Sequence, residues 1–398
     1  MNILAVGAIA LTAASCSDDD PVGGKVTPFR PVDLPAETRS AVTAGNDFSL
    51  SLFRTAPDEA NCILSPYSVF STLSMLANAD AGEAGKEILS KFGYSEPEVG
   101  IAALNSYCSI LNKTLPTLDG RVSLNMSNSL WTVSDPVPSF LSTLTENYMG
   151  EWICESPAGE SGKEAVNKYV AKNTDNMITE FLNAPFDSDV MLLNTVYFNG
   201  KWKQEFDSEL TKPGKFRNID GKEVTTPFMT VESSFDAFGD DNVTAVEFPY
   251  GSGNFAMTLL MPADGSSFAD FRHKLSASYL DEVITDMHPV SCTVSLPKFK
   301  TDARFDLEEN LQKMGFKKIF DSEYDNLIKR GSVRMNKFLH AAAIEVDEKG
   351  TKAAAATYIG GETSVGPGSM IRFDSPFIYI IRETSTNTIL FAGQITKF

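Results

Sequence analysis

Histidine and clustered positive charge are both scarce in this chain of 398 residues. The three histidines, His273, His288 and His340, do not have the spacing of metal ligands. Lys and Arg number 34 against 52 Asp and Glu, which gives a net charge of −18. Such an acidic balance argues against a nucleic-acid partner and against a surface that binds anionic lipid directly. We therefore expect no metal, no cofactor and no nucleic acid.

The motifs of common enzyme classes are also missing. The chain contains no G-x-S-x-G elbow, no P-loop and no G-x-G-x-x-G phosphate cradle. One S-x-x-K runs from Ser295 to Lys298, but Pro297 interrupts it and its neighbours alternate like a strand. We expect the protein not to be an enzyme; a hydrolase whose catalytic residues come together only in the fold is the alternative.

Cysteine is used sparingly and without C-x-x-C spacing. Four of the five cysteines lie in apolar or strand-like contexts, which predicts free core thiols and no disulfide framework. These four are Cys62, Cys108, Cys154 and Cys292.

The N-terminus begins with an uncharged apolar run, Met1 to Ala14, that is too short to span a membrane as a helix. It predicts a signal peptide over residues 1–15, although no basic residue precedes the run. Cys16 resembles the lipidated cysteine of a bacterial lipoprotein, and the acidic stretch Ser17–Asp20 resembles the surface-export tags of Bacteroides-type lipoproteins. The alternative for Cys16 is a chance cysteine after an ordinary signal peptide. The alternative for the acidic stretch is a merely solvated spacer.

This N-terminus also sets the domain boundaries and the localisation that we expect. Residues 21–36 are rich in Pro and Gly, so residues 16–38 are predicted to form a flexible tether and residues 39–398 a single domain. The protein would be secreted across the inner membrane and held at the outer membrane, on the cell surface, by the lipid anchor alone.

The periodicity of apolar residues indicates an α+β fold, because helical patterns come early, strand patterns come late and no regular βαβ alternation is present. Helices are predicted over Val42–Phe53, Pro66–Ala77 (with Ser65 as N-cap) and Glu164–Phe181. Strands are predicted over Val190–Phe198, Phe255–Met261, Cys292–Leu296, Phe377–Ile381 and Ile389–Phe391.

The segment Glu345–Ile359, EVDEKGTKAAAATYI, has an ambiguous preference. Its alanines favour a helix, whereas Thr357–Ile359 favour a strand. The small, polar stretch GGETSVGPGS that follows predicts a long exposed loop, which in a compact domain is usually functional. The combination suits a segment that changes its conformational state.

These residues, together with four other motifs, resemble the serpin family over roughly residues 39–398. The hinge is EKGTKAAAATYI at Glu348–Ile359, and the other motifs are LSPYS at Leu64–Ser68, LLNTVYFNGKW at Leu192–Trp202, VSLPKFK at Val294–Lys300 and SPFIYIIRETSTNTILFAG at Ser375–Gly393. The resemblance implies a serpin fold of three β-sheets, about eight to nine helices and an exposed reactive-centre loop.

The resemblance also implies a mechanism. A target serine protease, or possibly a cysteine protease, attacks the loop and forms a covalent acyl complex, and the cut loop then inserts into the main sheet as a new strand. With a period of two, Thr351, Ala353, Ala355 and Thr357 would face the core, and all are small or moderate in size. Lys352 departs from the acidic residue common in the family, but it would face outward. The intact hinge favours a suicide-substrate inhibitor; a non-inhibitory serpin with a binding or structural role is the alternative.

Counting from Gly350 places the scissile P1 residue at Ser364, with Val365 as P1′; counting back from Pro376 shifts the cut later, so Thr363, Ser364 and Val365 are all candidates. Small residues at P1 fit the shallow pockets of elastase-like or subtilisin-like proteases and not trypsin-like pockets. We expect a monomer. We also expect no glycosaminoglycan partner, because the basic residues are scattered.

Three groups of residues carry over from the family by their motifs. The hinge group is Glu348, Gly350, Thr351, Ala353, Ala354, Ala355, Ala356 and Thr357; the shutter group is Ser65, Ser68, Asn194 and His340; the breach group is Trp202, Lys298 and Glu348. The resemblance further implies an ion pair between Lys298 and Glu348 near Trp202.

Overall fold

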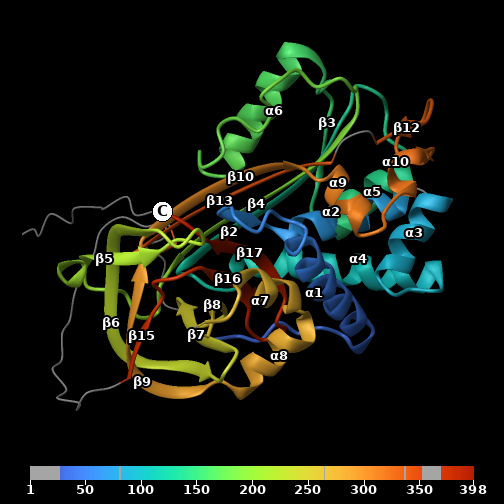
Figure 1. Ribbon diagram of the computed structural model, residues 1–398. Coiled ribbons are helices and arrows are strands. Elements are labelled where there is room, and N and C mark those ends of the chain that lie inside the picture. The colour runs from blue at the N-terminus through green and yellow to red at the C-terminus, as the bar shows by residue number, and fades with distance from the viewer. Residues whose placement is uncertain (1–26, 80–81, 264, 336–337, 352–368) are drawn as a thin grey trace, which may run out of the picture.

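A computed structural model of the protein describes residues 27–79, 82–263, 265–335, 338–351 and 369–398 (Figure 1). The predictions for Cys16, for Ala353–Thr357 of the hinge and for the reactive site Thr363–Val365 lie outside these residues.

Helices gather mainly in the first half of the chain. The described residues form ten α-helices, where about eight to nine were expected. The shortest, α10, has only four residues and leaves no periodicity to be recognised. The helices are α1 (Arg39–Phe53), α2 (Pro66–Ala79), α3 (Glu83–Lys91), α4 (Pro97–Thr114), α5 (Pro138–Asn147), α6 (Gly159–Asn173), α7 (Phe268–Lys274), α8 (Ala277–Asp286), α9 (Glu308–Lys313) and α10 (Lys318–Asp321), with short 3-10 helices η1 (Ala36–Thr38), η2 (Leu115–Thr117) and η3 (Ser208–Leu210).

Three sheets complete the α+β fold, as the sequence predicts. The nine-stranded sheet has the order β1-β17-β16-β8-β7-β6-β9-β15, with β5 paired to β6, and the six-stranded sheet has the order β10-β13-β14-β4-β2-β3. The strands of the first are β1 (Cys62–Leu64), β5 (Lys212–Arg217), β6 (Glu223–Gly239), β7 (Val243–Tyr250), β8 (Phe255–Pro262), β9 (His288–Pro297), β15 (Ser369–Arg372), β16 (Phe377–Glu383) and β17 (Ile389–Ile395). Those of the second are β2 (Val122–Trp131), β3 (Glu151–Ile153), β4 (Met191–Lys201), β10 (Phe299–Asp306), β13 (Leu339–Asp347) and β14 (Gly350–Thr351), and a small third sheet pairs β11 (Glu323–Tyr324) with β12 (Val333–Arg334).

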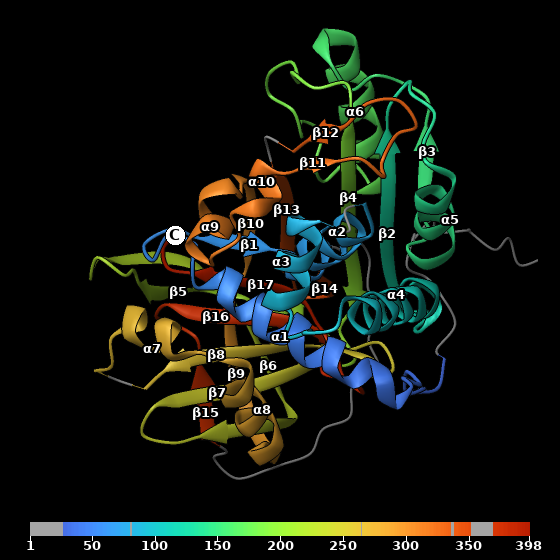
Figure 2. The ribbon, with the colours of Figure 1, turned by 90° about the vertical axis from the view of Figure 1, so that its right-hand side faces the viewer.

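The six-stranded sheet lies between two helices, and its strands cross those of the nine-stranded sheet steeply (Figure 2). On one face α2 packs against β4 and β17, and α6 covers the other face over β2 and β4. The α2 face belongs to the main core, whereas α6 closes a second cluster that includes Trp131, Val166, Val170 and Leu193. A strand added to the middle of this sheet would therefore turn one face toward the main core.

Most predicted elements are present, and the bounds of one helix are wrong. The helix predicted over Glu164–Phe181 is α6, which begins and ends earlier, at Gly159–Asn173. It ends before Asp175 and Asn176, whose positive φ angles of 48° and 59° are incompatible with a continuing helix. Ser65 precedes α2 as expected, and its hydroxyl donates to the carbonyl oxygen of Leu390 at 3.0 Å.

The last part of the predicted tether packs against the domain. Val32 is buried, and its N–H donates to the Ser385 hydroxyl at 2.9 Å. The Asn254 side chain donates to the carbonyl oxygen of Arg30 at 2.5 Å. Residues 27–38 are therefore part of the folded body, which the Pro-rich composition of this segment does not predict.

Candidate functional site

The centre of the six-stranded sheet is held together by a strand of only two residues. Gly350 and Thr351 of β14 pair with Asp347 and Val346 of β13 on one side. On the other side Thr351 pairs with Gly200 of β4, and both ladders are antiparallel. Beyond β14, no ladder joins β4 to β13 within the residues that the structure describes. The two strands thus border a slot that begins where β14 ends.

A tight turn at Glu348–Lys349 connects β13 to β14. The Asp347 carboxylate accepts hydrogen bonds from the N–H groups of Lys349, at 2.9 Å, and Gly350, at 3.3 Å. Burial raises the pKa of Asp347 although these two donors oppose the rise. A Cβ atom at Gly350 would lie 2.0 Å from the carbonyl oxygen of Gly200, so only glycine fits this approach of β14 to β4.

An aromatic stack closes the top of the slot. Trp202 is fully buried, and its indole N–H donates to the carbonyl oxygen of Asp347 at 2.9 Å. The Trp202 ring stacks on Tyr250 with centroids 4.4 Å apart, and the Tyr250 hydroxyl bonds to that of Thr351 at 2.6 Å. Thr351 is 1% exposed and faces the core, as the period of two predicts.

The ion pair predicted near Trp202 is present. Lys298 Nζ donates to Glu348 at 2.7 Å, and the hydroxyl of Thr211 donates to the other carboxylate oxygen at 2.8 Å. Burial alone would raise the pKa of Glu348, but the bonds from Lys298 and Thr211 outweigh it and lower that pKa. The turn that carries the hinge is thus fixed to the junction between β9 and β10 and to the residue before β5.

The four predicted shutter residues lie beneath the slot and form two separate pairs. The backbone N–H of Ser65 donates to His340 Nε2 at 3.0 Å, so the ring accepts at this nitrogen. Burial lowers the pKa of His340 to about 4, which keeps the ring neutral at neutral pH. This pair joins the start of α2 to β13.

The second pair, Ser68 and Asn194, joins α2 to β4 on the opposite side of the slot. The Ser68 hydroxyl donates to the amide oxygen of Asn194, and the Asn194 amide donates to Asn128 of β2 at 2.5 Å. Asn128 in turn donates to the carbonyl oxygen of Tyr148 at 2.6 Å. The sequence analysis missed Asn128, which lies between Ser127 and Ser129 in β2 and therefore does not stand out as a polar residue in an apolar run.

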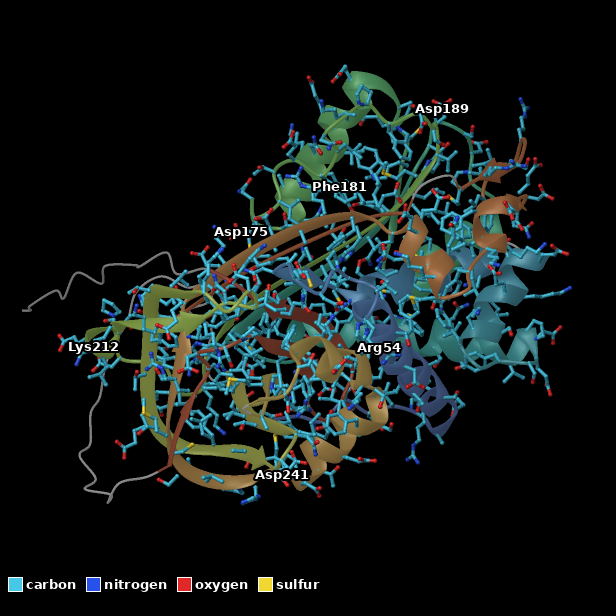
Figure 3. The ribbon with its side chains drawn as sticks, in the orientation of Figure 1. Arg54, Asp175, Phe181, Asp189, Lys212 and Asp241 are labelled. Carbon is cyan, nitrogen blue, oxygen red and sulfur yellow. The ribbon has the colours of Figure 1, made fainter. Side chains whose placement is uncertain are left out.

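A partly open cavity lies at the lower end of the slot. It reaches from α2 to the segment after α6, where Phe181 lies (Figure 3). Both shutter pairs contribute to its wall through Ser68, Asn194 and His340. The cavity is lined otherwise by mainly apolar residues, including Val69, Leu76, Phe186, Val190, Met191, Leu193, Phe338 and Leu339.

The first described strand after β14 lies in the nine-stranded sheet. β15 pairs in parallel with β9 at the edge of the nine-stranded sheet. Its Arg372 lies 4.1 Å from the centroid of the Phe228 ring and forms an ion pair with Asp374 at 3.2 Å. Residues 352–368 therefore connect the slot to a firmly held strand of the other sheet.

Other kinds of site find no support in the described ranges. No group of three or more His, Cys, Asp or Glu side chains could hold a metal there. No helix among these residues is long and apolar enough to cross a membrane. The four cysteines from Cys62 onward are free, as predicted, but Cys154 is exposed and not a core thiol, because it lies just after the short edge strand β3.

Comparison with known proteins identifies the family. Residues 43–398 match the model of the family described as Serpin (serine protease inhibitor). The chain belongs to the serpin family. Iripin-8 and Iripin-2 of Ixodes ricinus are 29% and 30% identical to it over 371 and 374 residues, which cover 88% and 91% of this chain and 92% and 94% of those relatives.

Solved serpin structures share the fold. The thermophilic serpin tengpin in its native state has a TM-score of 0.83 at 24% identity and covers 94% of this serpin and 97% of its own chain. Thyroxine-binding globulin in complex with thyroxine has a TM-score of 0.80 at 23% identity, with coverage of 90% and 99%. At these identities the likeness concerns the fold alone.

Proposed function

We propose that this serpin is a suicide-substrate inhibitor of serine proteases that cleave after small residues. The observation that carries the proposal is the seating of β14 at the top of an otherwise unpaired slot between β4 and β13. A strand that continues β14 downward would find a ladder partner on each side. Because unpaired backbone groups of a sheet favour strand addition, the slot supports insertion of the cleaved loop.

The register of β14 identifies which residues would become neighbours on insertion. Continuing the pairs Thr351–Val346 and Thr351–Gly200 places Ala353 between Ile344 and Phe198. The same register places Ala355 between Ala342 and Val196, and Thr357 between His340 and Asn194. Directly opposed residues of a sheet share a face, so all three would enter the core with small side chains. No charge would have to be buried.

The chemistry of trapping is that of an interrupted peptide cleavage. The protease serine attacks the P1 carbonyl carbon, the peptide C–N bond breaks, and the protease histidine transfers the serine proton to the leaving amine. The serpin is then held as an ester, while the new N-terminus stays with β15 in the nine-stranded sheet. Insertion of the freed hinge carries the acylated protease away, and inhibition results if insertion precedes hydrolysis of the ester.

Small candidates at P1 support an elastase-like or subtilisin-like target. Ser364 is the first candidate for P1, with Val365 as P1′ and Thr363 as the alternative. The test mixes the serpin with neutrophil elastase, pancreatic elastase and subtilisin and follows complexes that survive boiling in detergent. Mass spectrometry of the released C-terminal fragment identifies the scissile bond, and papain tests whether a cysteine protease is trapped too. Complete cleavage without a complex contradicts the proposal.

A matched variant tests the P1 assignment separately. Ser364→Arg should move inhibition from elastase to trypsin, because only a basic P1 pairs with the acid of a trypsin-like pocket. The same substitution at Val365 should leave trypsin uninhibited. If Val365→Arg redirects inhibition instead, the cut lies one residue later and the trapping mechanism still stands.

The non-inhibitory alternative predicts cleavage without a complex, and without a gain in thermal stability. We also propose that Cys16 carries a lipid after removal of residues 1–15 and holds the inhibitor at the outer face of the outer membrane, where it meets extracellular proteases. The apolar leader and the acidic Ser17–Asp20 stretch support this proposal. Cys16→Ala should release the protein from the membrane fraction.

A further inference from the structure

The hydroxyl pair of Tyr250 and Thr351 is the contact that places a side chain of β14 in the core. Both residues are buried, with exposures of 0% and 1%, and their oxygens lie 2.6 Å apart. The rest of β14 is held by backbone pairing with β13 and β4. The side chain of Glu348, in the turn before β14, is held by Lys298 and Thr211. Within β14 itself, the hydroxyl bond of Thr351 is therefore the side-chain link to the domain.

Tyr250 is itself fixed in place from several directions. The backbone of Tyr250 forms an antiparallel bridge with Trp202, and the N–H of Gly251 donates to the carbonyl oxygen of Lys201 at 2.8 Å. Its ring lies 4.4 Å from that of Trp202 and 4.9 Å from that of Phe198. The phenol oxygen consequently points to one place, which is the position of the Thr351 hydroxyl.

We propose that Tyr250 is a positioning residue that latches Thr351 into the sheet before cleavage. When the turn before β14 and its first ladder pairs are already formed, the cleaved loop can extend β14 by adding one residue at a time. A free hinge must first lose the conformational entropy of entering the slot. The latch therefore acts on the race between insertion and hydrolysis, and this consequence rests on the proposed inhibitory function. The seating of Thr351 in the uncleaved protein does not depend on the proposed inhibitory function.

The test removes hydroxyls without changing shape. Tyr250→Phe and Thr351→Val each delete one partner, Thr351→Ser retains it, and the double variant Tyr250→Phe/Thr351→Val deletes both. A matched control is available in Tyr107 and Thr388, a buried Tyr–Thr hydroxyl pair at 3.0 Å that does not involve β14. Tyr107→Phe reports what the loss of such a bond does to the domain in general.

The first readout is hydrogen exchange of the uncleaved protein in a peptide that spans Glu348–Thr351. Exchange should be about tenfold faster in Tyr250→Phe and in Thr351→Val, as the loss of one buried hydrogen bond implies. The double variant should be no faster than either single one, while Thr351→Ser and Tyr107→Phe should match the wild type. Equal exchange in Tyr250→Phe and Tyr107→Phe would overturn the latch, whether or not any protease is inhibited.

The second readout is the stoichiometry of inhibition, the number of serpin molecules consumed for each protease trapped. It should rise in Tyr250→Phe and Thr351→Val and stay at the wild-type value in Thr351→Ser and Tyr107→Phe. An unchanged stoichiometry despite faster exchange would show that a seated hinge does not speed insertion and would overturn that part of the proposal. If the wild type traps no protease, the proposed function fails, and the exchange experiment still decides the latch.

Discussion

His340 shows how much a single side chain in this site depends on its surroundings. The ring accepts the N–H of Ser65 and is 5% exposed, on the strand that borders the slot. A protonated ring would bring an N–H donor against the N–H of Ser65 and would place an unpaired charge in the core. The neutral ring is therefore part of what keeps α2 and β13 together.

This burial predicts an acid-dependent loss of stability. The folded pKa of about 4 lies below the value of about 6.5 in an unfolded chain, so the unfolded state binds more protons between these values. The contribution of His340 is fully present above about pH 6.5 and is lost as the pH falls toward 4, by roughly 3 kcal/mol in total. Urea unfolding at several pH values should show this slope in the wild type.

Two variants separate His340 from other titrating groups. His340→Gln should lose the pH-dependent part of the unfolding free energy in this range and should be less stable at neutral pH. His288→Gln, at an exposed position, should keep the wild-type slope. A slope that is unchanged in His340→Gln would show that other groups cause the acid sensitivity.

At the scale of elements, insertion depends on which hinge residues would face the core and which would face solvent when β14 is continued in its present register. Ala353 would oppose Ile344 and Phe198 on the core face, whereas Lys352 would oppose Glu345 on the other face. Glu345 is partly exposed and forms an ion pair with Lys300 at 3.0 Å. A lysine at position 352 is thus compatible with insertion, because it would meet a carboxylate at the surface.

Because adjacent hinge residues would lie on opposite faces of the sheet, substitutions at positions 352 and 353 should affect protease trapping very differently. Ala353→Arg should convert the inhibitor into a substrate, because insertion would bury an unpaired charge, and cleavage should continue without trapping. Lys352→Gln should remain an inhibitor with little change. The fraction of protease trapped and the fraction of serpin cleaved, measured on one gel, compare the two variants. Similar trapping by both would contradict insertion in this register.

The element boundaries show where local pattern suffices and where it does not. The buried strands β4, β8, β16 and β17 are predicted because long apolar runs need no context to be recognised. The end of α6 is mispredicted, because apolar residues also follow Asn173 outside the helix. Phe181, for example, packs beside the slot. The prediction that Cys154 is a core thiol is wrong because the edge strand before it has only three residues, too few to show an apolar pattern.

At the scale of the whole molecule, the protein has a central sheet whose middle is incompletely paired. The main core and the cluster beneath α6 hold the two halves of the sheet from opposite faces, while only β14 joins them by backbone pairing within the described residues. Because no ladder beyond β14 joins β4 and β13 among the described residues, backbone pairing added between them would release free energy.

Cleavage within the loop should therefore stabilise the protein strongly. If the residues after Thr351 insert, they form ladders with both β13 and β4, and with about 1 kcal/mol for each new hydrogen bond the melting temperature should rise by roughly 10 °C or more. Calorimetry of the intact protein and of the protein cut by a catalytic amount of protease measures the shift. Ala353→Arg, cut in the same way, is the control and should gain little. An equal melting temperature before and after cleavage of the wild type would favour the non-inhibitory alternative.

The sequence by itself determined the α+β class, the buried strands and the face on which each hinge residue would lie, because these follow from periodicities of two and 3.6 residues and from contiguous motifs. Only the tertiary structure decided that Thr351 is already seated, that Tyr250 bonds to it across 101 positions of sequence, and that Ser65 meets His340 across 275. Asn128 enters the site in the same way, through a partner on a neighbouring strand. Such pairings depend on the register of strands and on the packing of helices across the chain, which no local pattern encodes.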